Sequence, residues 1–355
     1  MILNIIQNLP MHKKSKEILG VIVKTILEVK VFSVREMARK AIGKMFVNPF
    51  NYSSNQALVN RISRFFNSHK WDYIKVQLSL AQFILNRLSR ERVNIHVLTD
   101  FTYLEDKWRI LSFAVPVGGR AIPILTVPVR KDAFSNLEWK SEVELVIQAI
   151  SLLLPILPKG TVFTFDREFT FPVLMEFLKA NGMYFVIRLK KTVYVDDKPI
   201  TELSPGIYED VTVHKTKANV YLKGYLNIDG KIDFYAYVSN LPKEKLTWEL
   251  YKERMKIEEM FKDEKDLFKL ERLSYITKTE VLGRWLTVFL IMLLSIYLLS
   301  RIKTDDHRVK LLWKELEEGK ISFVRYAMGL TDIYSITLKV SKIGRLVLMA
   351  GGVQK

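Results

Sequence analysis

Residues 94–129, NIHVLTDFTYLEDKWRILSFAVPVGGRAIPILTVPV, contain three apolar segments separated by short turns. The segments span 94–100, 108–117 and 120–129, and they are rich in branched and aromatic residues. Such runs, bounded by turn formers, are typical of β-strands. Gly118 and Gly119 provide a tight connection between the second and third segments. The stretch therefore predicts three consecutive strands, the first of which ends at Asp100.

The sequence then alternates between helical and extended patterns. We expect helices over 137–154 and 170–181, and strands over 161–166 and 183–190. Three strands followed by helix, strand, helix and strand form a mixed α/β sheet with flanking helices. Residues 191–245 instead combine alternating stretches with turn formers such as Asp-Asp and Ser-Pro-Gly, which predicts a small antiparallel β insertion.

Both ends of the chain are expected to be helical. Segments 33–43 and 53–68 resemble a helix-turn-helix with a basic second helix, in which Arg61 and Arg64 face outward. Plain helical packing explains the pattern equally well. The predicted division is a helical N-terminal domain at 1–90 that would bind DNA, an α/β core in two parts at 91–190 and 246–330, the β insertion at 191–245 between them, and a basic tail at 331–355.

Composition limits the possible partners and cofactors. The chain has 355 residues, 55 Lys and Arg against 38 Asp and Glu, and a formal charge of +17, which favours a polyanionic partner. There are no cysteines, so thiolate metal sites, iron–sulfur clusters and a Cys nucleophile are excluded. The five histidines are scattered without metal-ligand spacing. A metal site would therefore use carboxylates, which favour Mg²⁺ or Mn²⁺.

The segment Tyr251–Lys265, YKERMKIEEMFKDEK, is predicted to form one continuous helix because it has good helix formers and no Gly or Pro. At about 100° per residue, Tyr251, Arg254, Glu258 and Lys265 fall on one stripe beside an apolar face. A solvated face of i,i+4 salt bridges is the ordinary interpretation of such a stripe. Glu258 is the only carboxylate on the stripe, so it is also placed to reach a metal beside cations that hold a phosphate.

Asp100 and Asp166 follow apolar strand-like runs. Ligands of open α/β sheets bind at the carboxyl ends of strands. Each aspartate alone has a structural alternative, as the cap of a turn or of the next helix. Asp100, Asp166 and Glu258 together would hold two Mg²⁺ ions about 4 Å apart, an arrangement suited to phosphodiester cleavage.

The motifs around these residues resemble those of DDE transposases of insertion sequences, which have an RNase H-like core. Tyr251, Arg254, Glu258 and Lys265 match the Tyr-x2-Arg-x3-Glu-x6-Lys pattern of one branch at all four positions. The segment FTFDREF (163–169) resembles the family's second-aspartate motif, and VLTDFTYLEDK (97–107) is similar, more weakly, to the first. The resemblance covers about residues 90–300.

The resemblance implies roles for individual residues. Asp100, Asp166 and Glu258 would be catalytic metal ligands for two Mg²⁺ ions, with Mn²⁺ able to substitute. Tyr251, Arg254 and Lys265 would hold DNA phosphates. Arg188, Lys190 and Lys191 are further candidate backbone contacts, although a solvated strand end explains them equally well. In hairpin-forming relatives an aromatic residue near the insertion stacks on a flipped base; Trp248 and Tyr235 are candidates, and a core role is the alternative.

The sequence thus predicts a DNA-cleaving and strand-joining transposase that acts on double-stranded DNA, as a homodimer in the synaptic complex. We expect it in the cytoplasm, associated with the nucleoid, because MILNIIQNLP is too short for a signal sequence. The alternatives are an RNase H-like nuclease or resolvase, and a non-catalytic DNA-binding protein derived from a transposase. A membrane-associated basic protein is a third, since Trp285–Leu299 is apolar; as a helix this run rises about 22 Å, short of a typical span.

Overall fold

The structure of the chain, a computed structural model, describes residues 2–29, 34, 38, 55–90, 94–133, 141–226, 232–268, 270–300, 307–318, 320 and 326. The chain divides into two compact units. The first unit contains Met1–Leu80, Val117–Ile122 and Met260–Lys355, and the second contains Ala81–Pro116 and Pro123–Glu259. The five-part division of the chain stays a prediction.

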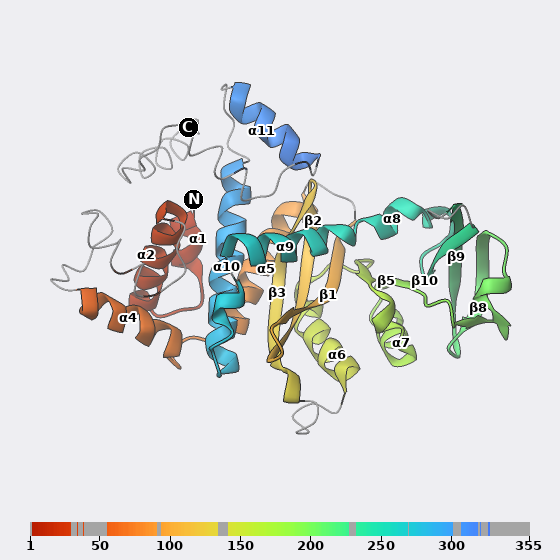
Figure 1. Ribbon diagram of the computed structural model, residues 1–355, viewed down its shortest axis with the longest axis horizontal. Coiled ribbons are helices and arrows are strands. Elements are labelled where there is room, and N and C mark those ends of the chain that lie inside the picture. The colour runs from red at the N-terminus through yellow and green to blue at the C-terminus, as the bar shows by residue number, and fades with distance from the viewer. Residues whose placement is uncertain are drawn as a thin grey trace. The chain divides into compact units, whose positions relative to one another are not determined.

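The second unit contains most of a ten-stranded sheet, several strands of which are labelled in Figure 1. The strands of its first half are β1 (His96–Leu104), β2 (Trp108–Val117), β3 (Arg120–Arg130), β4 (Val162–Phe165) and β5 (Tyr184–Arg188). They lie in the order β3-β2-β1-β4-β5. Strand β2 is antiparallel to β1, whereas β4 is parallel to both β1 and β5. This order and these directions are those of an RNase H-like sheet, so the predicted fold class is confirmed.

One predicted boundary in this sheet is wrong. Asp100 is not at the end of the first strand, because β1 continues to Leu104 and pairs with β2 along most of its length. The residues after Asp100 are mostly buried, as expected for a strand inside a sheet that is covered on both faces: Phe101, Thr102 and Leu104 are buried, and Tyr103 is exposed. Asp166, in contrast, directly follows β4, as predicted.

The predicted antiparallel insertion is present and extends the same sheet. Its strands are β6 (Tyr194–Val195), β7 (Lys198–Pro199), β8 (Gly206–Val213), β9 (Thr216–Leu226) and β10 (Ile232–Ser239). Strand β10 joins the insertion to the core by pairing antiparallel with β5. Two hairpins turn through pairs of residues with positive φ, Asp196–Asp197 and His214–Lys215. Two consecutive left-handed residues match the twist of a β-hairpin.

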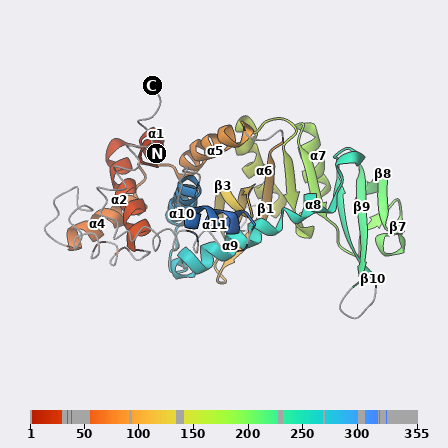
Figure 2. The same cartoon turned by 90° about the horizontal axis from the view of Figure 1, so that it is seen from above.

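Helices cover both faces of the core sheet (Figure 2). Helices α6 (Glu142–Leu153) and α7 (Pro172–Ala180) lie on one face, and α8 (Trp248–Lys252) lies on the other. Alternating side chains of β1 therefore point to different surroundings. Phe101 stacks on Phe169 at a centroid distance of 5.5 Å, whereas its neighbour Asp100 points to the opposite face.

The first unit is helical. It contains α1 (Ile2–Asn8), α2 (Lys13–Val29), α4 (Asn55–Asn67), α10 (Thr279–Ser300), α11 (His307–Glu317) and parts of α5 (Tyr73–Ser89) and α9 (Met255–Phe268). The rings of Phe66 and Trp285 stack 3.8 Å apart, and Arg284 donates a 2.8 Å hydrogen bond to the carbonyl of Phe66. These contacts pack α10 against α4. The predicted helix at 33–43 and the tail at 331–355 lie almost wholly outside the described residues.

Helix α10 is long and apolar enough to cross a membrane by length and composition. Residues 281–298 of this helix are nevertheless all buried within the protein. Gln77 donates a 3.0 Å hydrogen bond to Thr287 in the middle of this helix, and both side chains are buried. A helix that is buried on all sides and makes a buried polar contact in its middle is typical of a protein core. We therefore interpret α10 as the core helix of the first unit.

Candidate active site

Two adjacent strands bring Asp100 and Asp166 to the same level of the sheet. Strands β1 and β4 run parallel, with Thr99 opposite Phe165. Asp100 and Asp166 are the next residues of these two segments. The carboxylate of Asp166 makes no capping bond to the short helix that follows it, although this was its structural alternative. The sheet therefore places two carboxylates side by side from distant parts of the chain.

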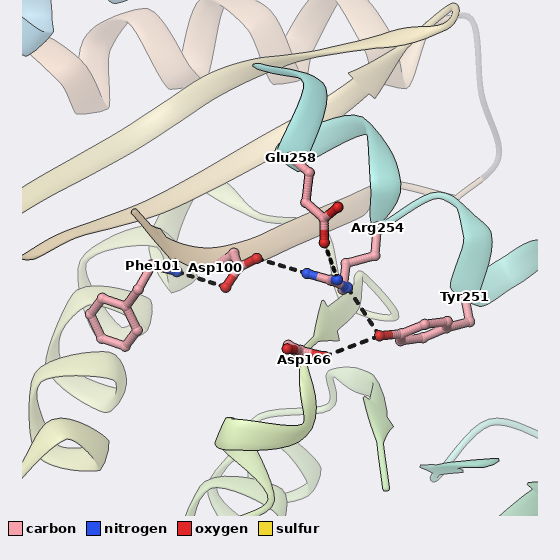
Figure 3. Close-up of polar contacts among 6 residues, drawn as sticks. All are labelled: Asp100, Phe101, Asp166, Tyr251, Arg254 and Glu258. Atoms are coloured by element: carbon pink, nitrogen blue, oxygen red, sulfur yellow. Dashed lines mark hydrogen bonds and ion pairs between the residues drawn. The ribbon is translucent and has the colours of Figure 1, made fainter. Parts of the chain in front are cut away.

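The third carboxylate, Glu258, comes from the segment predicted as one helix over Tyr251–Lys265. That prediction is wrong in one respect, because α8 ends at Lys252 and α9 begins at Met255. At the break the bonds tighten to three residues, from the amide of Arg254 to the carbonyl of Tyr251 and from Ile257 to Arg254. The stripe survives the break, since Tyr251, Arg254 and Glu258 still point toward one another (Figure 3).

Packing of α8 fixes the position of Tyr251. Thr247 caps α8 by accepting a hydrogen bond from the amide of Leu250. Tyr251 is buried in an apolar cluster with Val186, Tyr237 and Leu246. Its hydroxyl is then held over the sheet, where it donates a 3.3 Å hydrogen bond to Asp166. The apolar side of the helix thus seats the polar side against the aspartates.

Arg254 stands at the centre of the site (Figure 3). Its Nη1 donates a 2.7 Å hydrogen bond to Asp100, its Nη2 donates to Glu258, and its Nε donates at 3.0 Å to the hydroxyl of Tyr251. The side chain of Arg254 is only 6% exposed, compared with 18% for Asp100 and 43% for Glu258. All three predicted metal ligands are thereby linked to one guanidinium, Asp166 through Tyr251.

The charges in this cluster are strongly coupled. Burial raises the pKa of Asp100 to about 6, partly offset by the positive charge of Arg254 and by the amide of Phe101. Burial alone would lower the pKa of Arg254, but Tyr251 and the three carboxylates raise it above the ordinary value. Arg254 is therefore a permanent cation that partly neutralises a group of acids.

The donor chemistry of the site fits a divalent metal, whereas the present arrangement of the donors does not. Three carboxylates are hard oxygen ligands of the kind that Mg²⁺ and Mn²⁺ prefer. Among the described residues, however, no three acidic or histidine side chains are grouped closely enough to hold an ion. The guanidinium of Arg254 lies between them instead. The acids would hold a metal once this cation moved aside.

The other predicted DNA contacts lie outside this cluster. Lys265 is in the last turn of α9 and belongs to the first unit. Arg188 lies 5.2 Å from the ring centroid of Tyr235, and Lys191 forms a 2.6 Å ion pair with Asp233. Lys190 is exposed. The roles of these residues stay predictions.

The two aromatic candidates for base stacking contact each other. Tyr235 and Trp248 stack at a centroid distance of 4.6 Å, and Trp248 lies 5.8 Å from the ring of Tyr251. Both candidates are half-buried. A stack that leads from the insertion to Tyr251 fits their alternative role, which is packing of α8 onto the sheet.

A second polar feature lies in the first unit and includes Arg61 and Arg64. We call it the basic groove; it has a volume of about 710 Å³. It is lined by His12, Lys14, Ser15, Ile18, Ala57, Asn60, Arg61, Arg64, Phe65, Ser68 and Lys70. The lining includes four Lys or Arg side chains and no carboxylate. Lys14 and Lys70 were not among the predicted DNA contacts, although the basic run at residues 12–14 is visible in the sequence. Lys70 follows α4 closely in the chain, whereas Lys14 reaches the groove from α2 through tertiary packing.

The RNase H-like sheet carries acidic residues on β1 and directly after β4, and a comparison with known families agrees with the resemblance found in the sequence. Residues 140–294 match the model of a family described as Transposase DDE domain. The matched range includes Asp166 and the whole Tyr251–Lys265 segment, whereas Asp100 precedes it. The match confirms the resemblance to DDE transposases.

Two further comparisons add little. No curated protein matches the chain. One similar solved structure is a piggyBac transposase synaptic complex with hairpin DNA, at 12% sequence identity and a TM-score of 0.39. That similarity covers 95% of this chain and 76% of the other. It is too slight to establish a shared fold, which rests on the strand order of the sheet.

Proposed function

We propose that this chain is a metal-dependent transposase that cleaves DNA at the ends of an insertion sequence and joins the freed 3′ ends to target DNA. The observation that carries the proposal is the convergence of Asp100, Asp166 and Glu258 on Arg254, from three separate segments of the chain. The match to the Transposase DDE domain family supports it.

The carboxylates of Asp100, Asp166 and Glu258 would hold the metal. Two Mg²⁺ ions, or Mn²⁺ in their place, would supply positive charge for the phosphate oxygens and lower the pKa of an attacking water. The protein residues would position the DNA. Arg254 would grip a backbone phosphate with its planar fork, and Lys265 would act as a point charge.

The reaction would proceed in two phosphoryl transfers. In the first, the oxygen of a water attacks the phosphorus at the element's end, and the bond to the 3′ oxygen breaks to release a 3′-hydroxyl. In the second, this hydroxyl attacks a phosphorus of target DNA and displaces another 3′ oxygen. Each step exchanges one P–O bond for another, so no oxidant or reductant is needed.

DNA would also contact the basic groove, with Arg61 and Arg64 as backbone contacts. The formal charge of +17 supports sequence-independent phosphate binding over a larger surface. Arg188, Lys190 and Lys191 are proposed as further contacts on the sheet side. Two ends in one synapse require at least a homodimer, and such a protein would work at the nucleoid in the cytoplasm.

The proposal is tested with a duplex that carries the DNA flanking the coding region. The wild type should nick this duplex in Mg²⁺ and join the product to a plasmid. Glu258→Gln and Asp166→Asn should abolish both reactions while binding the duplex almost normally. Glu253→Gln is a matched control, because Glu253 lies on the same segment and pairs with Lys256 instead. Full cleavage by Glu258→Gln would contradict the assignment, and cleavage without joining would favour a nuclease or resolvase.

A further inference from the structure

Two of the three proposed metal ligands, Asp100 and Glu258, already contact a cation that belongs to the protein, and the third, Asp166, is linked to it through Tyr251. Every nitrogen of the Arg254 guanidinium donates to this cluster: Nη1 to Asp100, Nη2 to Glu258 and Nε to Tyr251. The hydroxyl of Tyr251 in turn donates a hydrogen bond to Asp166. The guanidinium thus occupies the place among the carboxylates where a divalent ion would need to bind.

A divalent ion and this guanidinium would compete for the same carboxylates. The ion needs oxygen lone pairs of Asp100 and Glu258 that now accept hydrogen bonds from Arg254. The ion and the guanidinium would also repel each other across a few ångströms. Solvent would screen this repulsion little, because the Arg254 side chain is only 6% exposed. Metal binding therefore requires the guanidinium to leave the carboxylates.

The position of Arg254 in the chain gives it a means of leaving. It lies at the break between α8 and α9, where Glu253 and Arg254 form a tight turn instead of a regular helical turn. Residues at the ends of two elements can change their backbone angles at smaller cost than residues inside a helix. A DNA phosphate is a bidentate acceptor that matches the guanidinium fork as well as a carboxylate does.

We propose that Arg254 is a competitor for the metal site in the DNA-free protein, and that a backbone phosphate of bound DNA removes it. This inference rests on the proposed function, because it assumes that the carboxylates bind metal and that the protein binds DNA. The inference adds that metal and DNA bind with positive coupling, so that each raises the affinity of the protein for the other. Arg254 would keep the site from assembling until DNA is present.

The alternative is that Arg254 braces the carboxylates in a geometry that a metal needs. The two possibilities predict opposite effects of removing its charge. If Arg254 competes, Arg254→Gln should raise the affinity of the DNA-free protein for metal. If it braces, the same substitution should lower that affinity. Arg254→Lys keeps the charge without the fork, so under competition its metal affinity should stay near that of the wild type.

The experiment measures Mn²⁺ binding to the full chain by the loss of the free-ion electron paramagnetic resonance signal, without DNA and without turnover. We expect Arg254→Gln to bind Mn²⁺ roughly tenfold more tightly than the wild type, within the usual range of coupling between two sites. Lys256→Gln, which loses an ion pair with Glu253 on the same segment, should leave Mn²⁺ affinity unchanged. Circular dichroism melts check that each variant is folded.

A second measurement uses only the wild type, in case Arg254→Gln does not fold. The duplex that carries the flanking DNA should tighten Mn²⁺ binding, and Mn²⁺ should tighten binding of the duplex by the same factor. Equal Mn²⁺ affinity with and without DNA, or weaker binding by Arg254→Gln, would overturn the inference and leave the transposase proposal intact. Absence of Mn²⁺ binding even with DNA would instead contradict the proposed function.

Discussion

Arg254 and Asp100 are separated by 154 positions in the chain, yet Nη1 of the arginine donates a 2.7 Å hydrogen bond to the carboxylate of the aspartate. Their side chains are 6% and 18% exposed. Breaking a buried pair by removing one partner leaves the other charge without compensation, which is more harmful than removing both. The pair is therefore a contact between β1 and the turn before α9 whose free energy can be measured.

The first prediction concerns this pair. Arg254→Ala should lower the free energy of unfolding by about 3 kcal/mol, near the lower end for a broken buried pair because Asp100 is partly exposed. Adding Asp100→Asn should recover part of that loss, since an amide needs no counter-charge. Urea unfolding of both single variants and the double variant gives the coupling energy. Strictly additive losses would show that the two side chains do not stabilise each other.

The second prediction concerns the basic groove. Arg64→Ala and Lys14→Ala should each weaken duplex binding in the absence of metal, because each removes a cation from a surface without lining carboxylates. Each substitution should also reduce the slope of log affinity against log salt by about 0.9 if the side chain neutralises one phosphate. Fluorescence anisotropy at several salt concentrations measures both quantities.

The control for the groove is Lys75→Ala, which removes an exposed lysine from the same unit outside the groove lining. It should change the salt slope less than either groove substitution. If all three variants behave alike, the effect comes from net charge and the groove has no special role. If Arg64→Ala and Lys14→Ala bind as the wild type does, the groove does not contact the duplex.

The core sheet was predictable because its strands carry their own local pattern. The segment before Asp166 is short, fully buried and bounded by Gly160, so both its type and its end follow from the sequence. The end of β1 was missed because Asp100 interrupts the apolar run, whereas the strand continues to Leu104 with most of its residues buried. A single acidic residue on a sheet face is compatible with the middle of a strand when a cation lies opposite.

The sequence was enough to predict which residues form the site, but not how they contact one another. Spacing placed Tyr251, Arg254 and Glu258 on one stripe, and the structure keeps them together. The break before Met255 has no local cause, since neither Gly nor Pro is present there. It accompanies contacts made elsewhere in the fold, between Tyr251 and the apolar cluster and between Arg254 and Asp100. For the same reason the sequence indicated Arg254 as a phosphate ligand and could not show its bonds to the carboxylates.

The third prediction concerns Glu264, a buried residue of α9 that the proposed chemistry does not use. Burial raises its pKa from 4.5 to about 8; neighbouring Asp263 acts in the same direction and Lys265 opposes. The folded protein therefore holds this proton more tightly than the unfolded chain. The resulting stability is fully present below about pH 4.5, falls by at most about 1.4 kcal/mol per pH unit, and is lost above about pH 8.

Glu264→Gln should remove this dependence, because an amide of nearly the same shape stays neutral at every pH. The free energy of unfolding of the variant should change less between pH 5 and pH 8 than that of the wild type. Glu271→Gln, at an exposed position of the same unit, should leave the wild-type profile in place. Superimposable profiles for the wild type and Glu264→Gln would mean that Glu264 is ionised in the folded protein.

The fourth prediction concerns Gly283 in α10. Alanine normally stabilises the interior of a helix by about 1 kcal/mol relative to glycine. Here a Cβ on residue 283 would lie 2.6 Å from the ring of Tyr73, closer than side chains tolerate. Gly283→Ala should therefore lower the free energy of unfolding by about 1–3 kcal/mol despite its better helix propensity.

Two further variants test the cause. In a protein that carries Tyr73→Ala, Gly283→Ala should be neutral or stabilising, because the ring is gone. Gly206→Ala, which places a Cβ in open space, is the control for a glycine replacement without a clash. If Gly283→Ala alone stabilises the protein, the helix does not approach Tyr73 this closely in solution.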